Sequence, residues 1–129
     1  TYEIKKLKSD PVNFFRENVK YDFKWVSSAD GLQVPYKIWS RKDQAKPRAI
    51  YLYTYGFIGI SQFGQYNRKF QGKLDQNGAV VIASPRGGGE LGLARQVDFK
   101  SDMFAKMNDV VAVANQLRAD FPNTPIVFS

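Results

Sequence analysis

The sequence predicts an α/β domain built around a mainly parallel sheet. Two near-continuous apolar runs, at 49–53 and 79–83, are typical of strands that are covered on both faces. A helical pattern lies between them at 65–76, and a longer one at 103–121 follows the second run. Strands that alternate with helices in this order indicate parallel strands joined by helical crossovers.

An antiparallel hairpin is predicted to precede these units. Bulky and polar residues alternate at 21–26 and again at 34–39, which is the pattern of half-buried strands. Between them, Asp30 favours a turn and Gly31 accepts a positive φ. Because Pro35 cannot donate a hydrogen bond to a neighbouring strand, we expect the second strand to be exposed at a sheet edge near this residue.

The shorter helix is predicted from a single apolar stripe. Tyr66, Phe70 and Leu74 recur at every fourth position within an otherwise polar segment. The pair Asn77-Gly78 then marks a turn before the next strand.

The longer helix is predicted from apolar residues at three- and four-residue intervals. Ser101 or Asp102 is a candidate N-cap, and Phe121-Pro122 ends the pattern. A final apolar strand follows at 124–128. We expect the stripe to face the core rather than a cofactor, and its members are Met103, Met107, Val110, Val111, Ala114 and Leu117.

The composition excludes several kinds of site. The 129 residues contain no His and no Cys, so this segment alone cannot carry a Ser-His or Cys-His mechanism, a disulfide or a zinc site. Asp98, Asp102 and Asp109 have helical spacings, but we expect solvated or capping carboxylates rather than a metal site or an acid pair. The segment is therefore not expected to be a complete enzyme, and no cofactor is expected.

The net charge of +7 raises the question of a nucleic-acid partner. The 19 basic residues are interleaved with 12 acidic ones, so we expect a solvated basic surface, or a face for an acidic partner, rather than a nucleic-acid site. No apolar run approaches the roughly 18 residues of a membrane span, and no signal-peptide pattern is visible. A sequence without Cys fits a cytoplasmic or a periplasmic bacterial protein, so localisation is left open.

Two glycine-containing segments follow the buried strands, where α/β sheets build their sites. The first, at 53–59, contains Tyr55, whose hydroxyl could stabilise an oxyanion; packing aromatics and turn glycines explain the same residues. The second, at 84–92, lacks the glycine spacing and the Lys of a phosphate-binding loop. We expect its backbone to pass close to other parts of the chain, with Arg86 and Glu90 held as internal charged partners.

Together, Tyr55-Gly56 after an apolar strand and the run from Arg86 to Gly92 resemble the prolyl oligopeptidase family of serine peptidases. The similarity is to the prolyl oligopeptidase and oligopeptidase B branches. Supporting matches lie at 8–11, at 29–36 and at Asp109, so the resemblance runs over nearly the whole chain.

The resemblance implies the N-terminal part of an α/β-hydrolase catalytic domain, which in that family is attached to a β-propeller. The parent protein would cleave short peptides through an acyl-enzyme, with Tyr55 donating to the oxyanion. Ile58 stands where the prolyl-specific branch has an aromatic, whereas Leu91 matches the oligopeptidase B form. The resemblance places these residues near the site: Gly56, Phe57, Ile58, Arg86, Gly87, Gly88, Gly89 and Glu90.

We expect 1–20 to be a lead-in from another domain and 21–129 to be the N-terminal half of the hydrolase domain. The last strand leads toward a Gly-x-Ser-x-Gly elbow, but Val127 stands where that motif needs Gly, so Ser129 is not the nucleophile. The nucleophile, Asp and His are expected beyond it. The segment alone should therefore be inactive, and it should self-associate or pair with its missing half.

Two alternatives stay open. The same fold could act as an esterase or acylaminoacyl hydrolase, or a homologue without the triad could act as a binding module. A comparison of peptide and ester substrates would separate the first alternative from a peptidase, and the absence of a Gly-x-Ser-x-Gly motif would favour the second. The partners expected on the main interpretation are a peptide substrate, the missing half-domain and a β-propeller, with no nucleic acid and no membrane.

Overall fold

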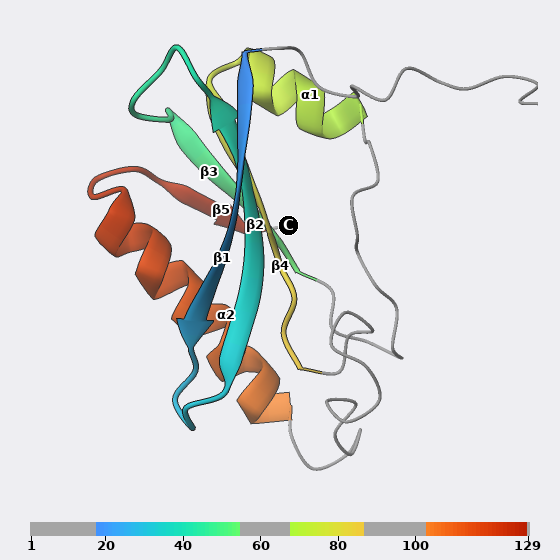
Figure 1. Ribbon diagram of the computed structural model, residues 1–129, viewed down its shortest axis with the longest axis vertical. Helices are drawn as coiled ribbons and strands as arrows, with labels where there is room; N and C mark the ends of the chain where they lie inside the picture. Colours follow the sequence, from blue (N-terminus) through green and yellow to red (C-terminus); the bar gives the residue numbers. More distant parts are fainter. Residues whose placement is uncertain (1–17, 55–67, 87–102, 129) are drawn as a thin grey trace, which may run out of the picture.

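In the part of the chain that the structure describes, a mixed five-stranded sheet carries one helix on each face (Figure 1). The computed structural model describes residues 18–54, 68–86 and 103–128. The strand order is β1-β2-β4-β3-β5, with β1–β2 and β2–β4 antiparallel and β4–β3 and β3–β5 parallel. The elements in chain order are β1 (Val19–Ser27), β2 (Gln33–Arg41), β3 (Ala49–Thr54), α1 (Arg68–Asp75), β4 (Gly78–Ala83), α2 (Met103–Asp120) and β5 (Ile126–Phe128).

The predicted hairpin is formed by β1 and β2, which pair from Val19 with Arg41 to Ser27 with Gln33. The turn closes where the Ser28 N–H donates to the Leu32 carbonyl at 2.8 Å. Gly31 has a φ of 85°, which a residue with a Cβ rarely adopts. The predicted turn chemistry is therefore confirmed.

The expectation that β2 is exposed at an edge near Pro35 is wrong. β2 lies between β1 and β4, and Pro35 is buried. Pro35 is tolerated because the paired register with β4 begins one residue later, at Tyr36 and Ala83. Its carbonyl still accepts a hydrogen bond from the Ser84 N–H at 3.0 Å.

Packing of α2 against one face of the sheet forms the larger core. Val113, Ala114 and Leu117 are buried against β2, β3 and β4, with Val110 partly buried beside them. The stripe predicted for this helix is correct at Val110, Ala114 and Leu117 and wrong at three other positions. Met103, Met107 and Val111 are 70%, 58% and 51% exposed, because the helix turns Asp109, Val113 and Leu117 toward the sheet instead.

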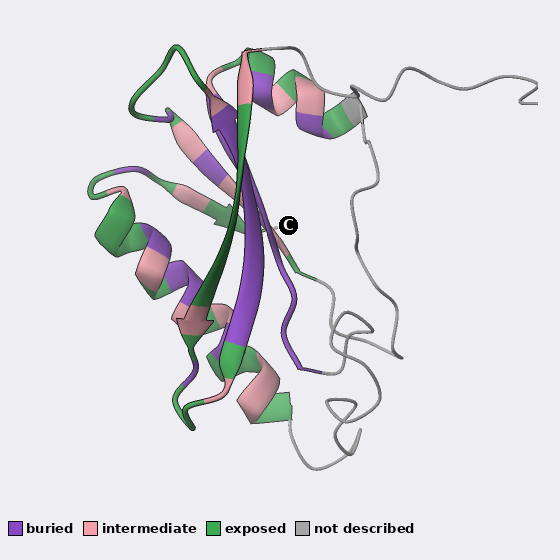
Figure 2. Cartoon of the chain, in the orientation of Figure 1, coloured by how far each residue is buried: buried purple, intermediate pink, exposed green. Residues whose placement is uncertain are grey.

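The smaller core lies on the opposite face, under α1. Phe70 and Leu74 are buried there against Trp39, Val80 and Ile82. Two members of the predicted stripe thus face the sheet, and Tyr66 lies outside the described residues. β4 runs between both cores and is buried along its whole length, whereas β1 is largely exposed (Figure 2).

Replacing Gly78 with Ala is expected to destabilise the fold by about 1–3 kcal/mol, as overpacking commonly does. A Cβ at this position would lie 2.8 Å from the Lys73 carbonyl oxygen and 2.8 Å from Cε2 of Tyr51. Urea denaturation measures the effect. The matched control is Gly72→Ala in α1, where a Cβ has no neighbour within 4 Å in the described part of the chain and Ala should be neutral or stabilising.

Several predictions fall outside the described residues and stay predictions. They are the lead-in predicted at 1–20, of which the structure describes 18–20 with β1 beginning at Val19, the N-cap at Ser101 or Asp102, and the role of Asp98. In the described ranges, no helix has the length and apolarity needed to cross a membrane.

Candidate functional site

The two predicted site segments leave the sheet next to each other. β3 and β4 are parallel neighbours, and their last residues, Thr54 and Ala83, are partners in the register. Tyr55 and Ser84 follow directly in the sequence. The carboxyl ends of parallel strands are where α/β folds build their sites, so the strand pairing supports the choice of these two segments.

Of the predicted site residues, the structure describes Arg86. It is 8% exposed and lies three residues beyond the end of β4. The other candidates lie outside the described ranges, and they are Tyr55, Gly56, Phe57, Ile58, Gly87, Gly88, Gly89 and Glu90. The geometry of the site is therefore built here around Arg86.

Arg86 forms a two-pronged ion pair with Asp109 of α2. Its Nε and Nη2 donate to the two carboxylate oxygens of Asp109 at 2.9 and 2.8 Å, and its backbone N–H donates to the same carboxylate at 2.9 Å. The side chains are 6% and 0% exposed. Three charge-assisted hydrogen bonds thus fasten the start of the segment after β4 to the middle of α2.

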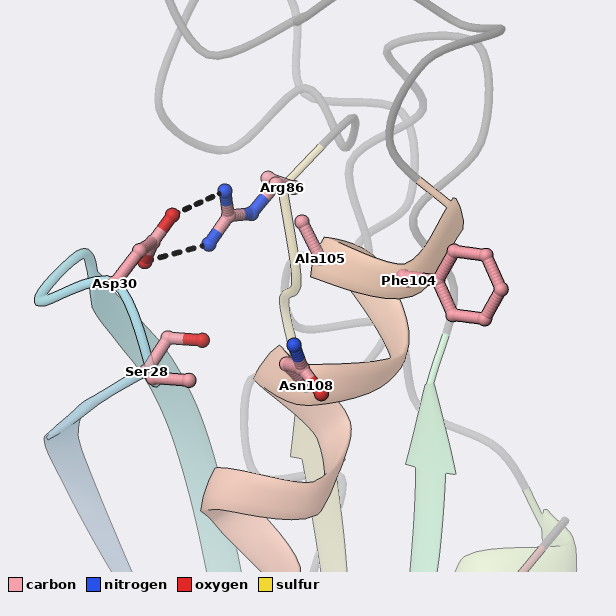
Figure 3. A pocket seen from close by; sticks show the side chains of 7 residues that line it. Ser28, Asp30, Arg86, Phe104, Ala105 and Asn108 are labelled. Atoms are coloured by element: carbon pink, nitrogen blue, oxygen red, sulfur yellow. Dashed lines mark hydrogen bonds and ion pairs between the residues drawn. The ribbon is translucent and has the colours of Figure 1, made fainter.

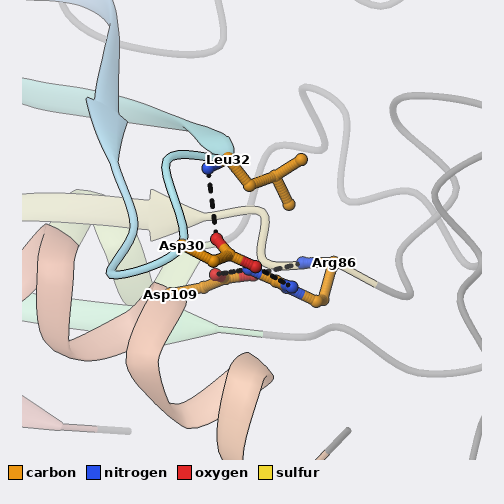
Figure 4. A network of polar contacts seen from close by, with 4 residues as sticks. All are labelled: Asp30, Leu32, Arg86 and Asp109. Carbon is orange, nitrogen blue, oxygen red and sulfur yellow. Dashed lines mark hydrogen bonds and ion pairs between the residues drawn. The ribbon is translucent and has the colours of Figure 1, made fainter.

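A second carboxylate, Asp30 of the β1–β2 turn, binds the outer edge of the same guanidinium (Figure 3). Nη1 and Nη2 of Arg86 donate to its two oxygens at 2.7 and 2.9 Å. Asp30 also accepts the Leu32 N–H at 3.1 Å, which ties the carboxylate to its own turn (Figure 4). Asp30, Arg86 and Asp109, called the Arg86 cluster below, therefore join three elements that are far apart in the sequence.

The electrostatics of the cluster favour its charged form. Hydrogen bonds from Arg86, and then from the Leu32 N–H, lower the pKa of Asp30 to about 2. Hydrogen bonds to Asp109 and Asp30 raise the pKa of Arg86. Because the folded pKa of Asp30 lies below its unfolded value, its contribution to stability is present above about pH 4 and is lost as the pH falls toward 2.

A carboxylate with so low a pKa is a poor proton acceptor at neutral pH, so Asp30 is not suited to be a general base. Among the described residues, no group of His, Cys, Asp and Glu could hold a metal ion. The chemistry of the Arg86 cluster is that of an anchor: it fixes Arg86, which follows β4, against α2 and the hairpin.

Sequence reasoning identified one part of this cluster correctly. Arg86 is an internal charged residue, as predicted, and Glu90 lies outside the described ranges. The expectation that Asp109 is solvated or a cap is wrong, because its side chain is fully buried beside Arg86. Asp30 and Asp109 both lie among the residues that carry the family resemblance, which is the signal that could have singled them out.

The chain is similar in sequence and fold to known peptidases. It is 32% identical over 124 residues to an uncharacterized peptidase of Sinorhizobium fredii, and this match covers 92% of the chain. A solved prolyl endopeptidase matches 88% of the chain with a TM-score of 0.81 and 28% identity. Oligopeptidase B from Leishmania major matches 86% of it with a TM-score of 0.76 and 25% identity.

These proteins are much longer than the chain. It spans 17% of the length of the Sinorhizobium peptidase, and 17% and 16% of the two solved chains. No protein-family model matches the sequence. The sequence and the fold nevertheless match, over almost all of the chain, one segment of proteins of the prolyl oligopeptidase family.

Proposed function

We propose that this chain is the N-terminal half of the α/β-hydrolase domain of a serine peptidase, which cleaves short peptides through an acyl-enzyme. The observation that carries the proposal is the match to a prolyl endopeptidase structure, with a TM-score of 0.81 over 88% of the chain. The similarity to oligopeptidase B of Leishmania major supports a peptidase of the same kind.

In this proposal Tyr55 donates to the oxyanion of the tetrahedral intermediate. The support is positional: Tyr55 directly follows Thr54, which pairs with the last residue of β4. The segment after β4 contains an anchored residue, Arg86, and would shape the wall beside Tyr55. Gly56, Phe57 and Ile58 would line the first segment, and Gly87, Gly88, Gly89 and Glu90 the second.

The nucleophile, Asp and His of the triad would lie beyond Ser129, so the segment alone would be inactive. Its partners would be the remaining half of the hydrolase domain, a β-propeller and the peptide substrate. Large apolar side chains at the surface support a missing partner: Met103 is 70% exposed, Phe104 82% and Phe128 58%. The isolated segment would self-associate through the same side chains.

Mass spectrometry and an active-site probe test this proposal together. Peptides of the native protein are expected to continue past Ser129 through Gly-x-Ser-x-Gly, and a fluorophosphonate should label that serine. The 129-residue chain, which is the matched control, should remain unlabelled. Continuation without the motif, or a full-length protein that resists the probe, would contradict the proposal and favour a binding module.

A further inference from the structure

A pocket of about 370 Å³ lies between the β1–β2 turn and the first turns of α2 (Figure 3). Ser28 and Asp30 line one wall, and Phe104, Ala105 and Asn108 line the other. Arg86 closes one end. A second hollow of about 420 Å³ continues from it along α2 and shares Ser28 and Asn108, so the pocket opens into a longer groove.

Ser28 brings an unused hydrogen-bonding group to this pocket. The residue is 6% exposed, and its Oγ has no hydrogen-bond partner among the described residues. Figure 3 shows the hydroxyl directed from the turn toward α2, across the pocket. A buried polar atom without a partner is costly, so a ligand that satisfies this hydroxyl would be favoured.

The Arg86 cluster gives the pocket an excess of negative charge. One guanidinium faces two carboxylates, Asp109 and Asp30, so these three side chains together carry one negative charge. Asp109 is fully enclosed, whereas the Asp30 side chain is 53% exposed and borders the pocket. The excess charge is therefore accessible at Asp30, which stays ionised because its pKa is about 2.

We propose that this pocket binds a primary ammonium group. A carboxylate offers about four acceptor directions, and three of those on Asp30 are used by Leu32 and Arg86. The remaining direction suits a single N–H donor, whereas a guanidinium seeks both oxygens at once, and Arg86 already binds both.

The other two N–H groups of an ammonium meet acceptors on both walls. Ser28 Oγ lies on the turn, and Asn108, whose amide can present its carbonyl oxygen by rotation about χ2, lies on α2. Charge and hydrogen bonds thus fit one chemical group.

Two sources supply such a group: the amino terminus or a Lys side chain of a bound peptide, or a Lys from another part of the longer protein. The test is calorimetric titration of the full-length protein with n-butylammonium chloride, with 1-butanol as the uncharged probe of the same length. Saturable binding of the ammonium alone is expected if the pocket receives an external ligand. Binding should weaken as salt is added, because the charge borders solvent.

Three variants locate the binding. Asp30→Asn should weaken it at least tenfold, and Ser28→Ala, which removes only a hydroxyl without a described partner, should weaken it several-fold with the fold intact. Asp22→Asn is the matched control, since Asp22 is an exposed carboxylate on β1 and does not border the pocket. Its affinity should equal that of the wild type.

A wild type that does not bind n-butylammonium still supports the proposal if a carbodiimide cross-links Asp30 to a Lys elsewhere in the protein. That link identifies an internal ammonium, and it should vanish in Asp30→Asn. If neither saturable binding nor this cross-link is found, or if 1-butanol binds equally well, the proposal is overturned. Both readouts measure binding, so they do not depend on the proposed peptidase activity.

Discussion

Replacing Asp109 with Ala is expected to lower the free energy of opening of α2 and of the segment Ser84–Arg86 by about 3–5 kcal/mol. The substitution removes a fully buried carboxylate that accepts three hydrogen bonds from Arg86. The guanidinium, 6% exposed, keeps its two hydrogen bonds to Asp30 but loses the buried carboxylate on its other side. Breaking one half of a buried ion pair costs more than the pair contributed, because the other charge remains desolvated.

Hydrogen exchange of the intact protein measures this effect where it acts. In Asp109→Ala, the protection of the Arg86 amide and of the central turns of α2 should fall by about two to four orders of magnitude. Asp120→Asn is the matched control on the same helix, since Asp120 lies at its solvated end and accepts from Gln116 at 3.0 Å. That change should cost less than about 1 kcal/mol.

A double variant tests whether the effect of Asp109→Ala comes from the broken charge pair or from the lost packing of the side chain. Arg86→Met with Asp109→Leu removes both charges and keeps the volume, so it should protect α2 better than Asp109→Ala does. If Asp109→Ala exchanged like the wild type, the buried pair would not be an anchor. If the double variant were as unprotected as the single one, packing rather than charge would explain the loss.

Local patterns predicted most of the fold. Alternation at 21–26 and 34–39 identified the strands of the hairpin. The half burial that it predicted is wrong, because β1 is largely exposed and β2 is buried along almost all of its length. Asn77-Gly78 identified the turn before β4, where Asn77 has a positive φ of 60°. These signals depend only on neighbours within a few residues, which the sequence displays directly.

Contacts between residues far apart in the sequence could not be predicted, because no local pattern contains them. Met103, Met107 and Val111 have the same helical spacing as Asp109, Val113 and Leu117, so periodicity alone could not decide which stripe faces the sheet. Asp109 on the buried face binds Arg86, 23 residues away in the sequence. Asp30 likewise has two roles: it forms part of its own turn, and it binds the guanidinium of Arg86, 56 residues away in the sequence.

The same distinction explains how much of the site was predictable. The strand-end segments with Tyr55 and Arg86 could be chosen from the sequence, because glycine-rich loops after buried strands are local features. The fact that they start beside each other required the pairing of Thr54 with Ala83. The cluster that fixes Arg86 required a three-dimensional structure, since its carboxylates belong to two other elements.

Replacing Tyr55 with Phe in the full-length protein is expected to lower kcat for a peptide substrate by about 10²–10³, the usual cost of removing one oxyanion donor. This prediction depends on the proposed peptidase activity. The hydroxyl would stabilise charge that develops only in the transition state, so KM should change much less than kcat. Steady-state kinetics on a fluorogenic peptide, with the fold checked by circular dichroism, measures both.

Tyr53→Phe is the matched control, because it removes a hydroxyl two residues earlier on β3. The Tyr53 ring packs against Phe70 with centroids 4.8 Å apart, and Phe preserves that contact. Turnover should therefore stay within about twofold of the wild type, since no transition-state charge would be lost. If the Tyr55→Phe enzyme were as active as the control, Tyr55 would not be an oxyanion donor. If KM rose and kcat stayed unchanged, Tyr55 would act in substrate binding instead.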